Sequence, residues 1–582
     1  MSAKKSDQQP IENFKSSSKG MSIREEEGWK LFTNFRAKVE AEHVCIGIDE
    51  SKNRTLTVRT SLDGKVTKHT VPYDDFQNNS WIGRHLGLDA KIDYKVIKGR
   101  YTLAEVITEL SPDKVKFTEV AKIGIYKHEG EICYVHSGGA ITANGTHRTD
   151  IKSNISGSLK QVCIPSLTEG DDPSSLVEQF LEAGKISEAN PCMSSLLFAS
   201  ATRAPLTDLK SNTVVPGCVG NTGVFKTSMA LVWQACFSPS LKEPICNFNS
   251  TARSTELTLQ QGGNTLIILD DLTPKHTGKD TEDCFEIVFG GVGNGSGRTL
   301  KNSTTTNAII ASLKSIPLIT GEIYPNATQS RKERIVIAKV EAGDVELDKL
   351  TNYQKIAASG ALAKVIGMFI AYILSNYEQL RQSIDKVFED YRDKANHILG
   401  HGYHRRAPSN VADLMLGIHY FLKFCWESDY LAKDKATQIK DYHFNNLIAL
   451  AKLQPVLQNT MDIKTLVRKE MSSYFRENFI IKDFSQISSI NPATFKKELI
   501  ALADYENKKL YILLETGDAV VKQLPGYLVR ILKCGPKSFW KVLKKHGLLV
   551  EWDSSAKKNY IRKMVNGKKY KLYSLAYFLL DE

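Results

Sequence analysis

The sequence predicts an α/β fold built around a nucleotide-binding core, and three observations support this class. First, the loop GNTGVFKTS (220–228) has the residue types that cradle phosphate groups. Second, the apolar run LIIL (266–269) ends in two acids, Asp270 and Asp271. Third, strand-like and helix-like segments alternate around both motifs, which is typical of an α/β domain.

The residue types in the loop divide the work of holding ATP and Mg²⁺. Glycines let backbone N–H groups turn toward phosphate oxygens, Lys226 reaches the β and γ phosphates, and the Thr227 hydroxyl ligates Mg²⁺. Phe225 stands where a glycine normally precedes the lysine. The residues expected to bind the nucleotide are Gly220, Asn221, Thr222, Gly223, Val224, Phe225, Lys226, Thr227 and Ser228.

The two acids complete the predicted site. Asp270, at the end of an apolar strand, is expected to hold the metal with Thr227, and Asp271 is expected to orient the attacking water. ATPases more often carry glutamate at that second position. Apolar strands often end in aspartates at a turn, so the acid pair gains its meaning from the loop that precedes it.

Length and composition limit the class of protein. A chain of 582 residues is too long for one core and predicts roughly three or four domains. With 42% hydrophobic and 24% charged residues, it resembles soluble globular proteins. The most apolar stretch, 360–374, contains Lys364 and is shorter than the roughly 20 residues of a membrane span, so it predicts a buried helix. The N-terminus lacks an apolar signal core, and a cytoplasmic protein without a membrane partner is expected.

Cysteine and histidine spacing does not favour a metal centre. The ten cysteines are scattered without a CxxC pair, which indicates a reduced compartment and no zinc finger. His397, His401 and His404 fall at helical spacing with no acid between them. A helix C-terminus with favourable dipole contacts is preferred over a metal site.

The first half of the chain divides into three predicted segments. Residues 1–43 are expected to be a disordered tail, to about residue 22, followed by a short helix near Arg24–Glu42. Residues 44–155 form a β-rich N-terminal domain, with a hairpin turning at Glu129 and Gly130. Residues 156–204 form a helical linker with helices at Pro173–Ala183 and Cys192–Ala204.

Three more segments follow. Residues 205–345 form the ATPase core, with further strands at Ile316–Thr320 and Ile335–Val340. Residues 346–482 are a helical lid and linker, with long helical patterns at Tyr353–Leu399 and Asn410–Trp426. Residues 483–582 form a C-terminal domain.

Polar residues near the core strands have predicted catalytic roles. Thr320, at the tip of its strand, can sense the γ-phosphate. Arg331 or Arg334, just before the last strand, can act as an arginine finger on a neighbouring subunit, and Arg406 or Arg405 can touch phosphates from the lid. Individually, each arginine is equally compatible with surface charge or nucleic-acid binding.

The C-terminal segment predicts a DNA-binding winged helix. Of the chain's net charge of +12, most lies in residues 521–582, where fourteen Lys and Arg face four Asp and Glu. Helices at 526–532 and 537–546 precede two strands joined by Asn566 and Gly567, a strong hairpin turn. Lysine runs are usually solvated, but these lie on elements that would face a groove. The expected DNA contacts are Lys537, Lys541, Lys544, Lys545, Arg562, Lys563, Lys568 and Lys569.

With these motifs, the chain resembles the AAA+ self-loading replication-initiator helicases of phages and of staphylococcal-type mobile islands and cassettes, relatives of the MCM helicases. The resemblance covers most of the chain. It rests on the loop at 220–228 and on six further stretches: IGIYKHEGEICYVHSGGAI (123–141), TRAPL (202–206), NSTARSTELTLQQ (249–261), LIILDDLTP (266–274), LITGE (318–322) and RKERIVIA (331–338).

The resemblance implies a P-loop AAA+ core in a hexameric ring that hydrolyses ATP between subunits and moves on single-stranded DNA, 3′ to 5′. It also implies origin binding by the C-terminal domain and contact with primase or other replication proteins. The stretch around Arg298 and Lys301 is either a DNA-touching hairpin or a surface loop. Two alternatives stay open: an origin-binding or regulatory protein whose ATPase is an assembly switch, and a defence ATPase.

Overall fold

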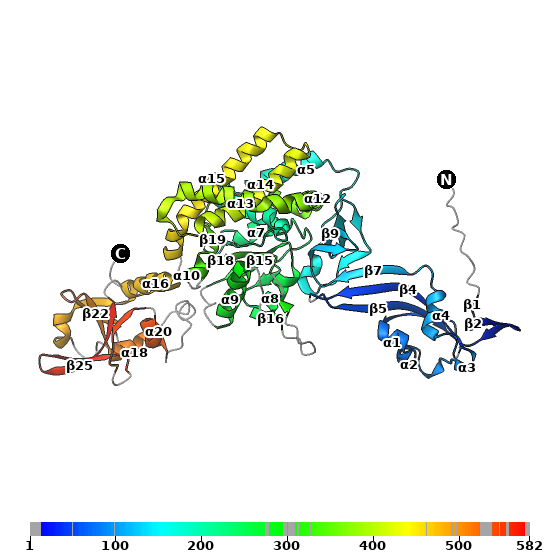
Figure 1. The fold of residues 1–582 in the computed structure, drawn as a ribbon. Coiled ribbons are helices and arrows are strands. Elements are labelled where there is room, and N and C mark those ends of the chain that lie inside the picture. Colours follow the sequence, from blue (N-terminus) through cyan, green and yellow to red (C-terminus); the bar gives the residue numbers. More distant parts are fainter. Residues whose placement is uncertain are drawn as a thin grey trace.

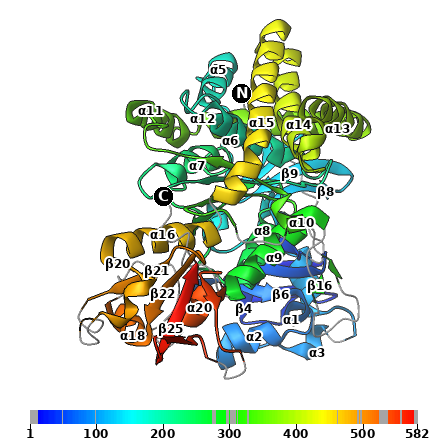
Figure 2. The same cartoon turned by 90° about the vertical axis from the view of Figure 1, so that its left-hand side faces the viewer.

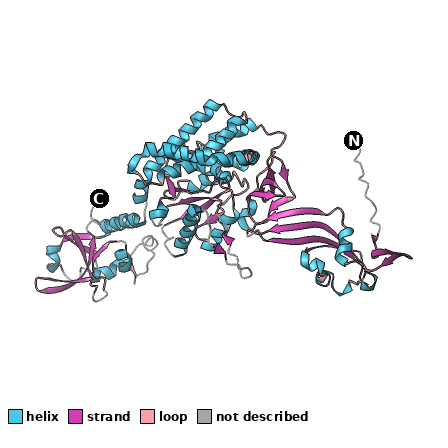
Figure 3. Cartoon of the chain, viewed as in Figure 1, coloured by secondary structure: helices cyan, strands magenta, loops and turns pink. Residues whose placement is uncertain are grey.

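The protein has a mixed α/β architecture with a parallel sheet, which confirms the α/β part of the expected fold class (Figures 1 and 3). A five-stranded parallel sheet and a group of long helices lie in the middle, with β-rich regions toward the two ends of the chain. The computed structural model describes residues 13–48, 50–97, 99–273, 279–294, 299–300, 309–310, 313–325, 329–460, 463–490, 494, 498–523, 538–545, 547–554 and 558–576.

The N-terminal region begins with strands from Phe14 onward, so the disordered tail expected to about residue 22 is wrong for residues 14–22, and the short helix expected near Arg24–Glu42 is wrong. A three-stranded antiparallel sheet and the first long strand cover this stretch: β1 (Phe14–Ser17), β2 (Gly20–Glu25), β3 (Gly28–Leu31) and β4 (Phe35–Ile46). Alternate residues of β4, Phe35, Ala37 and Val39, are buried, which is the period of a strand and not of a helix. The charged residues between them made this alternation hard to recognise in the sequence.

A five-stranded sheet in the order β12-β7-β4-β5-β6 forms the body of the N-terminal region. Its apolar face packs on short helices, and the core between them contains Val39, Val58, Trp81 and Val106. The elements are β5 (Lys52–Leu62), β6 (Lys65–Pro72), α1 (Tyr73–Gln77), α2 (Ser80–His85), η1 (Gly87–Asp89), α3 (Tyr94–Ile97), α4 (Leu103–Glu109), β7 (Val115–Val120) and β12 (Ile151–Ser153).

A second, four-stranded sheet joins the N-terminal region to the centre. It contains β8 (Gly124–His128), β9 (Glu131–His136), β10 (Gly139–Thr142) and β11 (His147–Arg148). The expected β8–β9 hairpin is confirmed by the antiparallel pairing of His128 with Glu131. The Asn264 side chain accepts a hydrogen bond from the Ile125 N–H at 2.9 Å and donates one to Thr207 at 2.8 Å. This asparagine therefore fastens the hairpin to the central domain.

The central sheet is parallel and has the strand order β14-β15-β18-β13-β19. All five strands end at the same edge, where the phosphate loop follows β13 and the acid pair ends β15. The elements of this part are β13 (Val215–Val219), α7 (Lys226–Gln234), β14 (Cys246–Asn247), α8 (Ala252–Gln261), β15 (Leu266–Leu272), α9 (Lys279–Asn294), β16 (Thr299–Leu300), β17 (Ile309–Ile310), β18 (Ile316–Gly321), α10 (Gln329–Lys332) and β19 (Ile335–Lys339).

Long helices lie over the central sheet (Figure 2). The two helices expected in the linker are confirmed, while the pattern at Tyr353–Leu399 contains three helices because the chain breaks at Gly360 and Asn376. The elements of this part are η2 (Gly157–Gln161), α5 (Pro173–Ala183), α6 (Pro191–Arg203), η3 (Ala204–Leu206), α11 (Leu347–Ala358), α12 (Ala361–Ser375), α13 (Tyr377–Leu399), η4 (Gly400–Gly402), α14 (Ala407–Glu427) and α15 (Lys433–Thr460). Helix α16 (Ile463–Asn478) follows and lies beside the C-terminal sheet (Figures 1 and 2).

The apolar stretch at 360–374 forms α12, whose residues are mostly buried as expected. No single helix among the described residues is long and apolar enough to cross a membrane. The pair α11 and α12 reaches that length and composition only together, with a bend of 57° between the two helices.

A buried ion pair connects the helices to the strand that carries the phosphate loop. Arg203, from the TRAPL stretch on α6, donates to Asp413 on α14 at 2.8 Å, and both side chains are only 1% exposed. Asp413 also accepts from the N–H and the hydroxyl of Thr213, two residues before β13. The network fixes the start of β13 relative to α6 and α14.

The C-terminal region contains a six-stranded sheet in the order β20-β21-β22-β25-β23, with β24 paired to β25. The expected hairpin is confirmed: Val565 pairs with Lys568 across Asn566 and Gly567. The helix expected at 526–532 lies outside the described residues. The elements are β20 (Ile480–Asp483), η5 (Phe484–Ser488), β21 (Ile500–Asp504), β22 (Lys509–Leu513), α18 (Leu514–Gln523), α20 (Phe539–Lys545), β23 (Leu549–Glu551), β24 (Ile561–Val565) and β25 (Lys568–Ala576).

Candidate nucleotide-binding site

A cavity of about 300 Å³ lies at the edge of the central sheet where its parallel strands end. The loop after β13, the acid pair of β15 and the end of β18 meet there. Its lining residues are Thr222, Gly223, Phe225, Lys226, Thr227, Ser228, Asp270, Asp271, Thr273, Gly321 and Glu322. The structure thus brings most of the predicted loop together with both predicted acids.

The backbone of the loop explains its residue types. Gly223 has φ +88° and Phe225 has φ +62°, both in the left-handed region. A side chain there costs about 1–2 kcal/mol, which is why glycine is usual before the lysine and why phenylalanine is an unusual occupant. A Cβ on Gly220 would lie 2.1 Å from the Val340 carbonyl oxygen, so this glycine permits the close approach of loop and β19. Helix α7 then begins at Lys226 and directs its N-terminal N–H groups at the cavity.

Lys226 is held in the loop, although it carries a charge. Its Nζ donates to the Asn221 carbonyl oxygen at 2.6 Å, and only 8% of the residue is exposed. Burial lowers the pKa of Lys226, while the nearby carboxylates of Glu322 and Asp270 oppose that shift. A polyphosphate entering the cavity would supply further negative charge and favour the ammonium form.

Three side chains form an oxygen cluster that suits Mg²⁺. The Thr227 hydroxyl donates to Asp270 Oδ1 at 2.8 Å, and the Thr320 hydroxyl donates to the same oxygen. Hydroxyl and carboxylate oxygens, completed by phosphate oxygens and water, are the ligands that Mg²⁺ prefers. Thr227 and Asp270 therefore fit the predicted metal site, and Thr320 lies beside it.

Two carboxylates, not one, border the cavity beside this cluster. Asp271 has φ +64°, and the pairing of β15 with β18 shifts register between Leu269 and Leu272, so a bulge aims successive acids differently. Glu322 follows β18 and accepts a hydrogen bond from the Thr222 hydroxyl. Glu322 was not predicted from the sequence. Its position directly after a core strand could have indicated it, since an acid there lies at the same edge of the sheet as Asp270.

The candidate arginines lie at the opposite edge of the sheet. Arg331 pairs with Glu286 on α9, and Arg334 donates to the Phe289 carbonyl oxygen at 3.0 Å. Both precede β19, whereas the cavity lies beyond the ends of the strands. A five-residue strand spans about 16 Å, which is more than an arginine side chain can bridge.

Arg406 belongs to the same cluster and lies away from the cavity of its own chain. Its Nε lies 3.8 Å from Glu333, and helix α14 is tied to this side by Asn410, which donates to the Glu333 carbonyl at 2.8 Å. Burial first, and then the charges of Arg406 and Arg331, lower the pKa of Arg334. Three arginines thus crowd one edge.

The predicted DNA contacts are only partly described. Arg298, Lys301 and Lys537 lie outside the described residues, as does the side chain of Lys545. Lys541 and Lys544 are on α20, and Lys544 Nζ lies 3.8 Å from the centre of the Trp552 ring. The other four lie on the β24–β25 hairpin: Arg562, Lys563, Lys568 and Lys569.

These hairpin lysines and arginine do not share one face. Arg562 and Lys569 lie on one side of the pleat, and Lys563 and Lys568 on the other. Lys563 is 3.6 Å from Asp504 and lies over the rings of Phe484 and Tyr511. The Lys563 side chain is therefore held by contacts within the C-terminal region.

The histidine cluster has a structural explanation. His397 is in the last turn of α13, and His404 Nε2 lies 2.5 Å from Glu333. No group of three metal-binding side chains occurs in the part of the chain that the structure describes.

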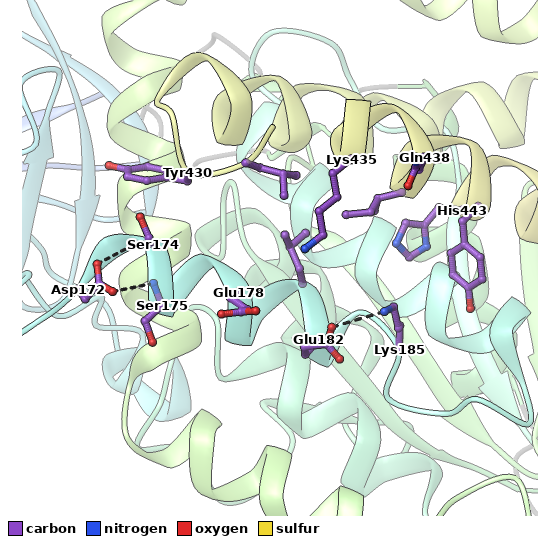
Figure 4. Close-up of a pocket in the computed structure, with 14 residues that line it drawn as sticks. Asp172, Ser174, Ser175, Glu178, Glu182, Lys185, Tyr430, Lys435, Gln438 and His443 are labelled. Atoms are coloured by element: carbon purple, nitrogen blue, oxygen red, sulfur yellow. Dashed lines mark hydrogen bonds and ion pairs between the residues drawn. The ribbon is translucent and has the colours of Figure 1, made fainter. Parts of the chain in front are cut away.

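A larger cavity of about 530 Å³ lies between α5 and α15, away from the phosphate loop (Figure 4). Glu182 contacts Lys185 at 3.5 Å on one wall, and Lys435 points into the space from the other. His443 borders the cavity but is almost fully buried. Its Nδ1 forms a hydrogen bond of 2.9 Å with Ser195 Oγ, and its ring stacks on Phe198. Burial lowers the pKa of His443 to about 3. None of the predicted site residues lies here.

No protein-family model and no curated protein matches the chain. Among solved structures, it aligns over 98% of its length with 99% of "SCCmec type IV Cch - active helicase", at 12% identity and a TM-score of 0.48. It also aligns with two A form apo structures of the NrS-1 C terminal region. They cover 74% and 72% of this chain and 92% and 90% of theirs, both at 8% identity, with TM-scores of 0.27 and 0.26. At these values the likenesses do not establish a shared activity, so function is inferred from the site.

Proposed function

We propose that the chain is an AAA+ ATPase of the P-loop class. The observation that carries the proposal is the meeting of Lys226, Thr227 and Asp270 in one cavity, with the helix α7 N-terminus directed at it. The strand order of the parallel sheet supports the proposal, because β18 lies between β13, which precedes the phosphate loop, and β15, which carries the acid pair. Strand β18 also places Thr320 beside Asp270 in the oxygen cluster.

The residues of the cavity have separate tasks in hydrolysis. The loop N–H groups and Lys226 bind the β and γ phosphates, and Thr227 with Asp270 would hold Mg²⁺. Mg²⁺, when bound, neutralises charge on the phosphate oxygens. Asp271, or Glu322 beside it, accepts a hydrogen bond from the attacking water and so aligns it. Thr320 senses the γ-phosphate. The activation free energy of hydrolysis is lowered by positioning and electrostatic stabilisation, since the protein forms no covalent bond to phosphate.

We further propose that the site is completed by a neighbouring subunit. Arg331, Arg334 and Arg406 are too far from the cavity of their own chain, yet they crowd together at one edge of the sheet. A head-to-tail contact would bring that edge to the cavity of the next subunit, and repeated contacts of this kind close into a ring. A hexamer is the ring size that the family resemblance implies.

The work done by this ATPase is proposed to be DNA unwinding. The motifs of the sequence resemble those of self-loading initiator helicases of mobile elements. Supporting features are the basic C-terminal segment and the β24–β25 hairpin next to α20, an arrangement compatible with a winged helix that binds origin DNA. Movement 3′ to 5′ on single strands, cooperation with a primase and a cytoplasmic location complete the proposal.

The second candidate function is an origin-binding protein whose ATPase acts as an assembly switch. The same cavity and the same basic segment would serve it. Hydrolysis stimulated by single-stranded DNA, together with strand displacement, supports the motor. Hydrolysis without strand displacement on any fork supports the switch.

The test of the site itself is phosphate release by the Lys226→Ala variant. Loss of the β/γ-phosphate contact should abolish hydrolysis, with the fold checked by circular dichroism. Hydrolysis at the wild-type rate in this variant would contradict the assignment of the cavity.

A further inference from the structure

The five-stranded N-terminal sheet has two unlike faces. One face carries the core described above. On the other face, Lys38 of β4, Arg59 of β5 and Lys68 of β6 lie directly opposite one another in a row across three strands. Arg36 projects from the same face, two residues before Lys38.

Such a row opposes the stability of the sheet. Side chains directly opposite on neighbouring strands have Cβ atoms about 5 Å apart, and like charges at that spacing repel. Glu40 contacts Lys68 at 2.7 Å and Arg59 at 3.4 Å, while Asp113 contacts Lys38 at 3.4 Å. Two carboxylates thus contact three of the four cations on this face. These pairs are exposed to water, so they are weak and can be exchanged for another anion.

A hollow of about 240 Å³ lies within this group of cations. Arg36, Lys38 and Arg59 line it, together with the hydroxyl-bearing residues Ser16, Thr60 and Ser61, and none of the described residues that line it is a carboxylate. Arg36 donates to the Ser61 hydroxyl at 3.0 Å, which orients the guanidinium within the hollow. Fixed guanidinium, ammonium and hydroxyl donors around a space of this size suit a phosphate group.

An aromatic group lies further along the same face. Phe117 of β7 is half-buried and stacks on His43 of β4, with ring centres 5.2 Å apart. Lys152 Nζ lies 5.9 Å from the Phe117 ring centre. From Lys38 to His43 the strand covers about 16 Å, a span that accommodates two or three nucleotides of an extended strand.

We infer that this open face binds single-stranded nucleic acid, with phosphate groups at Arg36, Lys38 and Arg59 and a base on Phe117. A positively charged surface combined with an aromatic platform is the common design of proteins that hold single strands without sequence preference. A duplex would satisfy the cations but leave Phe117 without an unstacked base. The inference rests on the proposed function for its choice of polymer, and it adds a second contact far from the C-terminal segment.

The test uses the full-length chain and a labelled oligothymidylate in a fluorescence-anisotropy titration over a range of salt concentrations. The triple variant Arg36→Gln/Lys38→Gln/Arg59→Gln should bind roughly a hundredfold more weakly near 0.1 M salt, with a salt slope smaller by about 2, since each phosphate contact on a single strand contributes about 0.7. The matched control neutralises three exposed cations outside this face, Lys91→Gln/Lys95→Gln/Arg100→Gln, and should bind like the wild type.

A second variant, Phe117→Leu, tests the platform. It should weaken binding of the oligothymidylate without changing the salt slope, and leave binding of a blunt duplex unchanged. If the triple variant bound the oligothymidylate with wild-type affinity and wild-type salt slope, the inference would be overturned. The cations of this face would then contact an acidic protein or only solvent. Equal losses for duplex and single strand, with no effect of Phe117→Leu, would overturn the assignment to single strands.

Misfolding and failure of the proposed ATPase are separable from this result. Removing mutually repelling cations should keep or raise the midpoint of thermal unfolding, so a folded variant is expected. ATP hydrolysis measured without DNA should be unchanged in all these variants. A wild-type chain that hydrolyses no ATP would contradict the proposed function, while the oligothymidylate comparison would still decide the sheet face.

Discussion

Replacing Arg334 by alanine isolates the proposed cooperation between subunits. Arg334 precedes the strand β19, which is about 16 Å long and separates it from the end of the sheet that carries the phosphate loop. The Arg334→Ala variant should therefore bind ATP normally. Its hydrolysis should fall by about 10³-fold or more, the range found when an arginine finger is removed.

Mixing two inactive variants gives the quantitative test. Arg334→Ala chains keep an intact cavity, and Lys226→Ala chains, which should not hydrolyse ATP, keep an intact arginine. In a ring with head-to-tail contacts, an interface is active only when the cavity comes from the first and the arginine from the second. At equal amounts and random assembly this holds for about a quarter of the interfaces. Phosphate release should then recover to about a quarter of the wild-type rate.

The assay is steady-state phosphate release across mixing ratios, with each variant alone as the baseline. Recovery should peak at equal amounts and disappear on dilution below the assembly concentration. No recovery at any ratio, with rings still formed, would refute the role of Arg334 across the interface. Loss of ATP binding by Arg334→Ala alone would refute the separation of the two edges.

Three further predictions follow from the described contacts. Asp413→Asn should lower the free energy of unfolding by about 3–5 kcal/mol in denaturant titrations, because it leaves Arg203 buried without its counter-charge, and a much smaller loss would contradict that network. Glu322→Gln and Asp271→Asn, compared by single-turnover hydrolysis, should identify the water-orienting acid: the group whose amide slows the step about a hundredfold or more is the general base. Between pH 7 and pH 5 the protein should lose stability, because His443 has a folded pKa of about 3, below its usual 6.5, and stays neutral only in the fold. Its stabilisation is complete above pH 6.5 and is lost as pH falls toward 3, about 2 kcal/mol at pH 5, and His443→Gln should reduce that loss in thermal melts.

The meeting of the loop residues and the acid pair in one cavity could largely be predicted from the sequence, because the pattern that predicts it is local. Lys226 and Thr227 belong to one short loop, and Asp270 ends an apolar run, so residue type and order carried the information. Glu322 was missed because its role depends on β18 lying between β13 and β15, which is a property of the sheet. The position of Arg406 could not be predicted for the same reason, because it depends on how α14 packs beside Glu333.

The N-terminal error has a different physical cause. The stretch from Arg24 to Glu42 mixes charged and apolar residues in a way that helical and strand periods both partly fit. Pairing with β5, fourteen or more residues further on, decides for the strand, and such pairing energy is invisible in a local window. The cation row across Lys38, Arg59 and Lys68 was hidden likewise, since only the register aligns three positions from separate strands.

The most direct test of the proposed helicase activity is ATP-dependent strand displacement on a forked DNA by the purified chain, with Lys226→Ala as the matched control. The wild type should separate the strands with ATP and Mg²⁺, and the control, though it binds the fork, should separate none. A wild-type chain that hydrolyses ATP yet leaves every fork intact, or a control that unwinds as well as the wild type, would contradict the proposed activity.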